Sequence, residues 1–271
     1  MRLVVDTNQA SLLPPLEKGG LKITLSPYVL AEVLLCRKPE PTLQLLHSFD
    51  IRLGLETLDV LIELAKLTPQ EIVAFEPFYV PGRKYRQNYA GILQALSGPR
   101  EEHLELARYI KSRHREYCGS LVATSKDLRK RLRDLGIADQ KFSAFEDAWS
   151  GMSSSPDSFM GSVIVGTITD DDQRPTQASP AELLEAVLAN QYLRRFFRIR
   201  LAYHVSITRL WADQDLNFDP SPSRDDMTDV MLPLYAANGD IIVTADTTLS
   251  KLITHSEPEG RIKVCRAGEI P

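Results

Sequence analysis

The sequence predicts an α/β protein that has a parallel sheet and a large, mostly helical insertion. Short apolar runs near both ends of the chain have the length and composition of strands buried on both faces. Segments of helical periodicity separate these runs, and such alternation is typical of parallel sheets. In the middle of the chain, helical segments follow one another without a strand pattern. We therefore expect the two ends of the chain to share one sheet.

The N-terminal part begins with the apolar run Leu3-Val4-Val5, which ends directly before Asp6. After a second short strand, Ser26 and Pro27 supply an N-cap and a first-turn proline for a helix. The elements predicted here are, in order, strands at 3–5 and 22–25, helices at 28–37 and 43–49, a strand at 51–55 and a helix at 58–67.

The middle of the chain, residues 68–220, is predicted to be the helical insertion. Proline, glycine and polar residues divide it into segments. Ser179 and Glu182 have the spacing of a capping box, and one helix is expected to run from there to about residue 211. The acidic stretch 170–175 before it is interpreted as a solvated loop.

The C-terminal part returns to the α/β pattern. We expect a helix over 224–237, kinked at Pro233 and ended by Asn238-Gly239, and then a strand at 241–243 that leads to Asp246. Ile262 and Val264 indicate a last short strand. The predicted α/β domain therefore combines residues 1–67 with 221–271.

The composition is that of an ordinary globular protein, with 43% apolar and 25% charged residues among 271. A net charge of -4 gives no overall attraction for a polyanion, so nucleic-acid binding would require a local basic patch. The three cysteines lack the spacing of a zinc site. Because there is neither a signal peptide nor a long apolar run, the expected location is cytoplasmic, with no membrane partner.

Four acids are expected to lie at one edge of the sheet. Asp6 and Asp246 each follow a predicted strand, and the carboxyl ends of parallel strands are where open α/β folds bind ligands. Glu32 and Asp229 lie in predicted helices beside those strands. Carboxylates gathered at one edge repel one another unless cations neutralise them, and Mg²⁺ or Mn²⁺ suits such oxygen ligands. This chemistry is typical of metal-dependent phosphodiester hydrolysis.

Three segments that carry these acids resemble the PIN-domain nucleases: VVDTN at 4–8, SPYVLAEV at 26–33 and DVMLPLYAANGDIIVTAD at 229–246. The resemblance implies that Asp6, Glu32, Asp229 and Asp246 bind divalent metal and catalyse endonucleolytic cleavage of RNA, leaving a 5′ phosphate. It also implies that Asn8 and Thr244 hold a carboxylate or a metal-bound water by hydrogen bonds. The predicted function is therefore a divalent-metal-dependent endoribonuclease.

The chain departs from a minimal toxin-type PIN domain in length, because most of its residues separate Glu32 from Asp229. Pro233 also lies close enough to Asp229 to change the direction in which that acid points. Asp226 competes with Asp229, although Ser223-x-x-Asp226 also has the form of a capping box. Each acid taken alone is more often a turn or surface residue than a ligand.

Two other functions are compatible with the same residues. One is a catalytically silent PIN-like module in which the insertion binds RNA or protein and the acids are vestigial. The other is a different Mg²⁺-dependent phosphotransfer enzyme or phosphatase on an α/β sheet. Carboxylates within about 2.0–2.6 Å of an ion would distinguish a metal enzyme from a silent module.

The substrate is expected to bind to a basic run over 108–133, in which nine basic residues stand against two acidic ones. Arg129, Lys130 and Arg131 are its predicted nucleic-acid-binding residues. A second candidate is the arginine-rich segment 192–203, whose interleaved aromatic residues are expected to be core. The predicted partner is RNA, or single-stranded DNA, with a protein partner possible through the insertion.

Overall fold

A computed structural model describes residues 1–13, 22–47, 49–80, 100–134, 141–169, 178–218, 230–257 and 261–270. Its centre is a five-stranded, all-parallel sheet in the order β3-β2-β1-β4-β5. The strands are β1 (Leu3–Val5), β2 (Lys22–Leu25), β3 (Asp50–Leu53), β4 (Ile241–Val243) and β5 (Lys263–Cys265).

The predicted joining of the two chain ends in one sheet is confirmed. β1 lies between β2 and β4, and its residues Leu3, Val4 and Val5 pair with the three residues of β4. All six residues of these two strands are buried, as continuous apolar runs predict for strands covered on both faces. The α/β class with a parallel sheet follows directly from these pairings.

Helices connect and cover the strands in the first and last parts of the chain. Their bounds are α1 (Thr7–Ala10), α2 (Pro27–Leu35), α3 (Glu40–His47), α4 (Thr57–Leu64), α5 (Pro69–Val73), α13 (Thr247–Ser256) and the short 3₁₀ helix η3 (Ala267–Glu269). The predicted cap of α2 is present, since Ser26 Oγ accepts the Val29 N–H at 3.2 Å and Pro27 occupies the first turn. Ser26 and Pro27 therefore fix where α2 begins.

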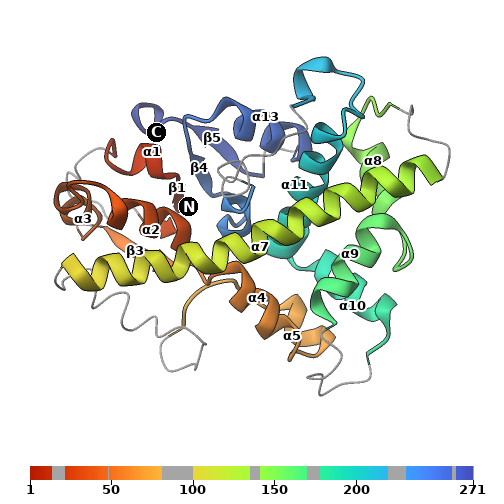
Figure 1. The fold of residues 1–271 in the computed structure, drawn as a ribbon, viewed down its shortest axis with the longest axis horizontal. Helices are drawn as coiled ribbons and strands as arrows, with labels where there is room; N and C mark the ends of the chain where they lie inside the picture. The colour runs from red at the N-terminus through yellow and green to blue at the C-terminus, as the bar shows by residue number, and fades with distance from the viewer. Residues whose placement is uncertain are drawn as a thin grey trace.

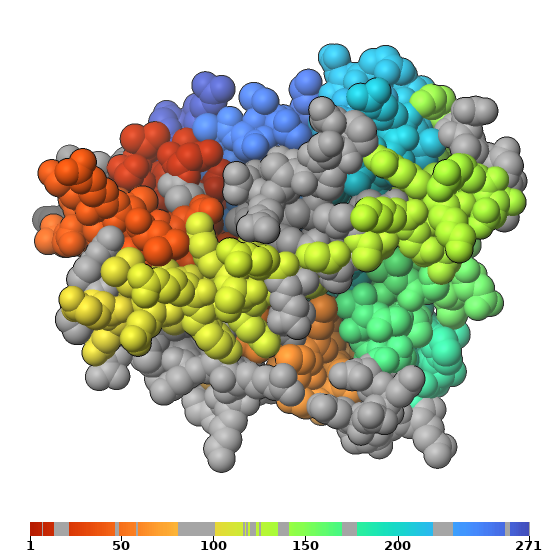
Figure 2. Space-filling view, in the orientation of Figure 1, coloured from red at the N-terminus to blue at the C-terminus, as the bar shows by residue number. Residues whose placement is uncertain are grey.

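The longest element is α7 (Arg100–Asp134), which crosses the whole molecule in Figure 1. Its 35 residues span about 52 Å at 1.5 Å per residue. It contacts α2 and α4 beside the sheet and α11 (Gln191–Ile207) further along. Much of it lies on the surface of the face shown in Figure 2. α7 thus links the region of the sheet to the later helices.

The described residues between α7 and the last part of the chain are helical. They form α8 (Phe145–Ser153), α9 (Phe159–Ile168), α10 (Pro180–Ala189), α11 and the 3₁₀ helix η1 (Gln214–Leu216). The capping box of Ser179 and Glu182 is present at the start of α10. The loop predicted at 170–175 lies outside the described residues.

The single helix predicted from 179 to 211 is wrong, because two helices meet at Asn190. This residue is extended (φ −76°, ψ 122°), ends α10 and caps α11. Its side-chain oxygen accepts the N–H groups of Tyr192 and Leu193, while its amide donates to the Ile72 and Phe75 carbonyls at 2.8 and 2.7 Å. These long-range bonds favour the break over a continuous helix.

The helix predicted over 224–237 is also wrong in its described part, since residues 232–235 form a 3₁₀ helix, η2 (Leu232–Tyr235). Pro233 has no N–H to donate and cannot continue an α-helix from the preceding turn. All four residues of η2 are buried, and it contacts β1 and α11. The helix also ends earlier than the predicted stop at Asn238-Gly239, because η2 ends at Tyr235, and Gly239, at φ +86°, lies in the turn before β4.

One hydrophobic cluster unites the sheet, its flanking helices and α11. The aromatic residues Tyr192, Phe196, Phe197 and Tyr203 are buried within it, which confirms that they belong to the core. Among the described residues, no helix has the length and apolar character needed to span a membrane.

Candidate functional site

The candidate site lies where β1 and β4 end beside each other. Val5 pairs with Val243, and the next N–H, that of Asp6, donates to the Val243 carbonyl at 2.9 Å. Asp6 and Thr244 therefore leave the sheet on neighbouring strands, at the same edge. Asp6 is 6% exposed, so its carboxylate is largely removed from solvent.

Thr244 connects the two strand-end acids. Its hydroxyl donates to Asp6 Oδ2 at 2.8 Å and accepts the backbone N–H of Asp246 at 3.0 Å. Thr244 is buried, so both bonds are shielded from water. One side chain thereby orients the Asp6 carboxylate and fixes the backbone that carries Asp246.

Asp246 is the N-cap of α13. Its Oδ1 accepts the Leu249 N–H at 2.8 Å, and the helix dipole favours a negative charge at this position. The side chain is half-buried, and the cap uses only one of its two oxygens. Asp246 therefore has a structural function, and Oδ2 is available for a further partner.

Asn8 and Glu32 lie in α1 and α2, the helices that follow β1 and β2. Glu32 lies in α2 and is only partly buried, although its neighbours from Pro27 to Leu34 are buried. Asn8 follows Asp6 by two residues in α1; it is exposed, and its backbone carbonyl accepts the amide of Gln9. The predicted function of both residues remains a prediction.

Asp229, the fourth predicted acid, and its competitor Asp226 lie outside the described residues. Within the described ranges, there is no group of three or more His, Cys, Asp or Glu residues placed to hold a metal ion. Asp6, Glu32 and Asp246 thus do not form a complete metal site by themselves.

A second acidic cluster, which the sequence analysis missed, lies beyond the end of β3. Glu56 and Asp59 are both buried at the start of α4. Arg113 of α7 pairs with both, through Nε to Glu56 Oε2 at 3.3 Å and through Nη2 to Asp59 Oδ1 at 3.0 Å. Burial lowers the pKa of Arg113, but attraction to Glu56 and Asp59 outweighs it and the pKa is raised. We call Glu56, Asp59 and Arg113 the buried ion triad.

Tyr28 of α2 completes the surroundings of this triad. Its hydroxyl donates to Glu56 Oε1 at 3.1 Å and accepts the Thr57 N–H at 3.0 Å. Burial, and then the nearby Glu56 charge, raises the pKa of Tyr28 well above its ordinary value, so the phenol stays neutral. The triad and Tyr28 hold α2, α4 and α7 together. Glu56 could have been found from the sequence, because it closely follows a predicted strand as Asp6 and Asp246 do.

The three predicted nucleic-acid-binding residues of α7 do not lie on one face. Arg129 is half-buried and donates to the Ile207 carbonyl of α11 at 2.8 Å. Arg131 pairs with Asp127 at 2.9 Å and donates to Ser162 Oγ at 3.2 Å. Lys130 is exposed. Because residues two apart on a helix point in widely different directions, Arg129 and Arg131 lie on different faces of α7, and their binding of nucleic acid remains a prediction.

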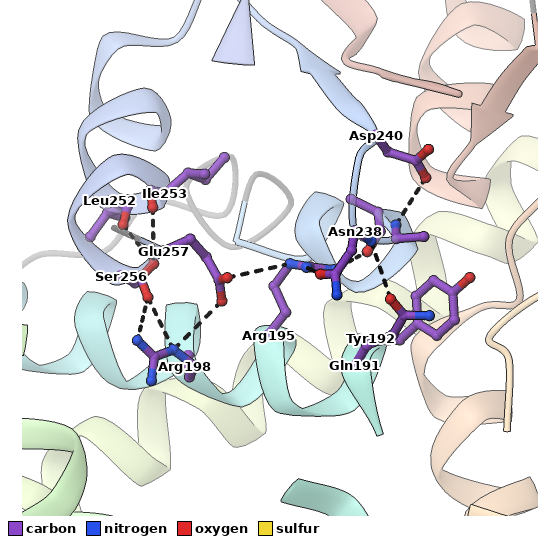
Figure 3. A network of polar contacts seen from close by, with 12 residues as sticks. Gln191, Tyr192, Arg195, Arg198, Asn238, Asp240, Leu252, Ile253, Ser256 and Glu257 are labelled. Carbon is purple, nitrogen blue, oxygen red and sulfur yellow. Dashed lines mark hydrogen bonds and ion pairs between the residues drawn. The ribbon is translucent and has the colours of Figure 1, made fainter. Parts of the chain in front are cut away.

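Two arginines of α11, the second candidate for substrate binding, are engaged within the fold. Figure 3 shows Arg195 and Arg198 on either side of Glu257, with Nε to carboxylate distances of 3.9 and 3.5 Å. Arg195 also donates to the Ala236 carbonyl and to Asn238 Oδ1, and Arg198 donates to the Ser256 carbonyl. These bonds attach α11 to α13 and to the turn before β4, so these two arginines are structural.

Comparisons with family models, curated protein sequences and solved structures give no match to this chain. The protein is defined by its own structure as an α/β protein with a five-stranded parallel sheet.

Proposed function

We propose that the edge around Asp6 and Asp246 is the divalent-metal site of a nuclease that hydrolyses phosphodiester bonds in RNA. The observation that carries this proposal is the pair of acids at the ends of β1 and β4, connected through Thr244. Ligand sites of open parallel sheets lie at the carboxyl ends of the strands. An acidic edge at that place suits a cation and the phosphate that the cation attracts.

The donor chemistry fits Mg²⁺ or Mn²⁺, which prefer carboxylate oxygens and retain several waters. In this proposal Asp6 and Asp246 Oδ2 hold the ion, and Glu32 and Asp229 are the remaining acids. A bound ion supplies an activated water and stabilises the leaving oxygen. The hydrogen bond from Thr244 to Asp6 Oδ2 at 2.8 Å holds the Asp6 carboxylate in one orientation. Asn8, in this proposal, hydrogen-bonds a carboxylate or a coordinated water.

The test compares Asp6→Asn and Asp246→Asn with wild type on end-labelled single-stranded RNA in Mg²⁺ or Mn²⁺. Asparagine is itself a good N-cap, so Asp246→Asn removes the charge while keeping the cap of α13. Asp213 provides a matched control, since it caps η1 by accepting the Asp215 N–H at 2.9 Å. Mutation of a residue that only orients a metal ligand typically lowers activity roughly 10- to 100-fold. Asp6→Asn and Asp246→Asn should each lower it by more than this, and Asp213→Asn should leave it unchanged.

Mn²⁺ binding, measured by electron paramagnetic resonance, should weaken in the same two variants. Cleavage that persists in excess chelator would contradict the proposal. RNA binding with no Mn²⁺ binding would favour the catalytically silent module. Hydrolysis of p-nitrophenyl phosphate without cleavage of RNA or single-stranded DNA would favour a phosphatase.

A further inference from the structure

A pocket of about 460 Å³ lies between the last turns of α7 and the end of α11. Its described lining is formed by Lys126, Arg129, Leu132, Arg133, Thr208 and Leu210. We call it the basic pocket. Its volume is within the range of small-molecule sites, about 300–1,000 Å³.

Three cationic side chains from one face of α7 meet in this pocket. Lys126, Arg129 and Arg133 are separated by three and four residues, the spacing that places side chains on the same face of a helix. No acid is among the described lining residues. Two acids lie in this part of α7: Asp127 pairs with Arg131 on another face, and Asp134 is exposed and is not among the described lining residues. The described lining of the pocket is therefore positively charged.

The three cations differ in how they are held. Arg129 is fixed by its bond to the Ile207 carbonyl, which also satisfies the exposed end of α11. For Lys126 and Arg133, no hydrogen bond or ion pair exists with any residue that the structure describes. Cations that share a pocket repel one another unless an anion lies between them. Arg129 is oriented by its hydrogen bond, whereas Lys126 and Arg133 have no partner among the described residues. This arrangement is suited to binding an anion.

The opposite wall of the pocket is also held in an unusual backbone conformation. Arg209, between the lining residues Thr208 and Leu210, has φ +59°, a region that glycine favours. The Leu210 N–H bonds to the Val205 carbonyl at 3.1 Å, which closes the end of α11 as a Schellman turn. Lys141 donates to the Arg209 carbonyl.

We propose that the basic pocket binds a phosphate group, the chemistry shared by small phosphorylated ligands and by the backbone of a nucleic-acid strand. Arginine binds phosphate through paired N–H bonds, and lysine adds a compact charge. Leu132 and Leu210 supply the apolar part of the described lining. The site requires neither Asp6 nor Asp246, so phosphate binding can be tested separately from metal-dependent cleavage.

The experiment measures binding in excess chelator, where metal-dependent cleavage cannot occur. The probes are pyrophosphate, by calorimetry, and a fluorescent 12-nucleotide oligouridylate, by anisotropy. Lys126→Ala/Arg133→Ala is the pocket variant; Arg129 is left intact because it holds α11. Arg108→Ala/Lys111→Ala is the control, since both residues are exposed on the same helix and the variant removes the same charge. Circular dichroism confirms that each variant is folded.

The pocket variant should weaken binding of at least one probe about tenfold or more, as expected from losing two phosphate contacts, and the control should change it less than about twofold. If the oligonucleotide is the ligand, its salt slope should fall by about 1.4 units in the pocket variant. Binding of pyrophosphate alone assigns the site to a small ligand, and binding of the oligonucleotide alone assigns it to a strand. Equal effects in both variants, or no binding of either probe, would overturn the proposal.

Discussion

A single hydroxyl, that of Thr244, joins the two acids at the ends of β1 and β4. It donates to Asp6 and accepts from the backbone of Asp246, so both of its hydrogen-bonding capacities are used in a buried place. A buried group that loses its partner costs about 1–3 kcal/mol. Both the stability of the fold and the orientation of the Asp6 carboxylate should therefore depend on this side chain.

We predict that Thr244→Val lowers the free energy of unfolding by about 1–3 kcal/mol, because valine leaves Asp6 Oδ2 and the Asp246 N–H without their partner. Urea denaturation measures this change. Mn²⁺ affinity should fall about 10- to 100-fold, an effect that a merely structural residue at a distance would not produce.

Thr24 of β2 provides the control. It is also fully buried in the sheet, but within the described residues its hydroxyl has no hydrogen-bond partner. Thr24→Val should therefore leave stability unchanged or raise it. A loss at Thr24 equal to that at Thr244 would mean that the hydroxyl of Thr244 has no special importance.

At the scale of elements, the buried ion triad decides how α7 sits against the sheet. Arg113 comes from the basic run that the sequence assigned to substrate, yet its guanidinium neutralises Glu56 and Asp59. Removing one partner of a buried ion pair costs about 3–5 kcal/mol, whereas removing charges on both sides costs much less. The packing of α7 against α2 and α4 should therefore depend on the buried ion triad.

We predict that Arg113→Met destabilises the protein by about 3–5 kcal/mol, since two carboxylates lose their counter-ion in the interior. In a Glu56→Gln/Asp59→Asn background the same substitution should cost far less, which a double-mutant cycle in urea measures. Equal costs in the two backgrounds would show that Arg113 acts through packing and not through charge.

Local patterns in the sequence were sufficient to predict the five strands and the helices α2, α3 and α4 near the sheet, but not α1 or α13. Apolar runs and caps such as Ser26 are properties of neighbouring residues, so they can be recognised without the fold. The break at Asn190 could not be predicted in this way, because its amide bonds to carbonyls more than a hundred positions away. Tertiary bonds of this kind decide where one helix ends and the next begins.

The candidate site was predictable to a similar degree. The position of Asp6 and Asp246 after buried strands placed them at one edge of the sheet. The cap formed by Asp246 was not foreseen, although Asp246 lies three residues before Leu249 at the start of a helix. The partners of Arg113, Arg129 and Arg131 depend on which face of α7 meets another element, and charge runs in a sequence carry no such information.

At the scale of the whole molecule, α7 and α11 bind the middle of the chain to the sheet. α7 contacts α2 and α4, while α11 contacts η2 and α13 and is tied to Glu257 through two arginines. One continuous core results. Because polar and charged groups are buried in these contacts, the stability of the entire fold should depend on pH.

The surroundings of His204 in α11 predict whether stability rises or falls with pH. It is fully buried, its Nε2 accepts the Arg200 Nε–H at 3.4 Å, and the rings of Phe159 and Tyr203 lie near it. Burial, with the Arg200 charge, lowers the pKa of His204 well below 6.5. Burial also lowers the pKa of His255, which packs on Trp211. Both histidines are therefore neutral in the fold at a pH where they are protonated in the unfolded chain.

The last prediction is that the free energy of unfolding falls as the pH is lowered from 7.5 to 5.5. A group with a depressed folded pKa stabilises the protein fully above its unfolded pKa, here about 6.5, and this contribution is lost as the pH falls toward the folded pKa. Each such histidine contributes a slope of at most about 1.4 kcal/mol per pH unit. In His204→Gln, which keeps an acceptor for Arg200 but cannot titrate, the slope measured by urea denaturation at several pH values should be smaller than in wild type. An unchanged slope in this variant would show that His204 does not titrate on unfolding, and stability that rises on acidification would contradict the sign for both histidines.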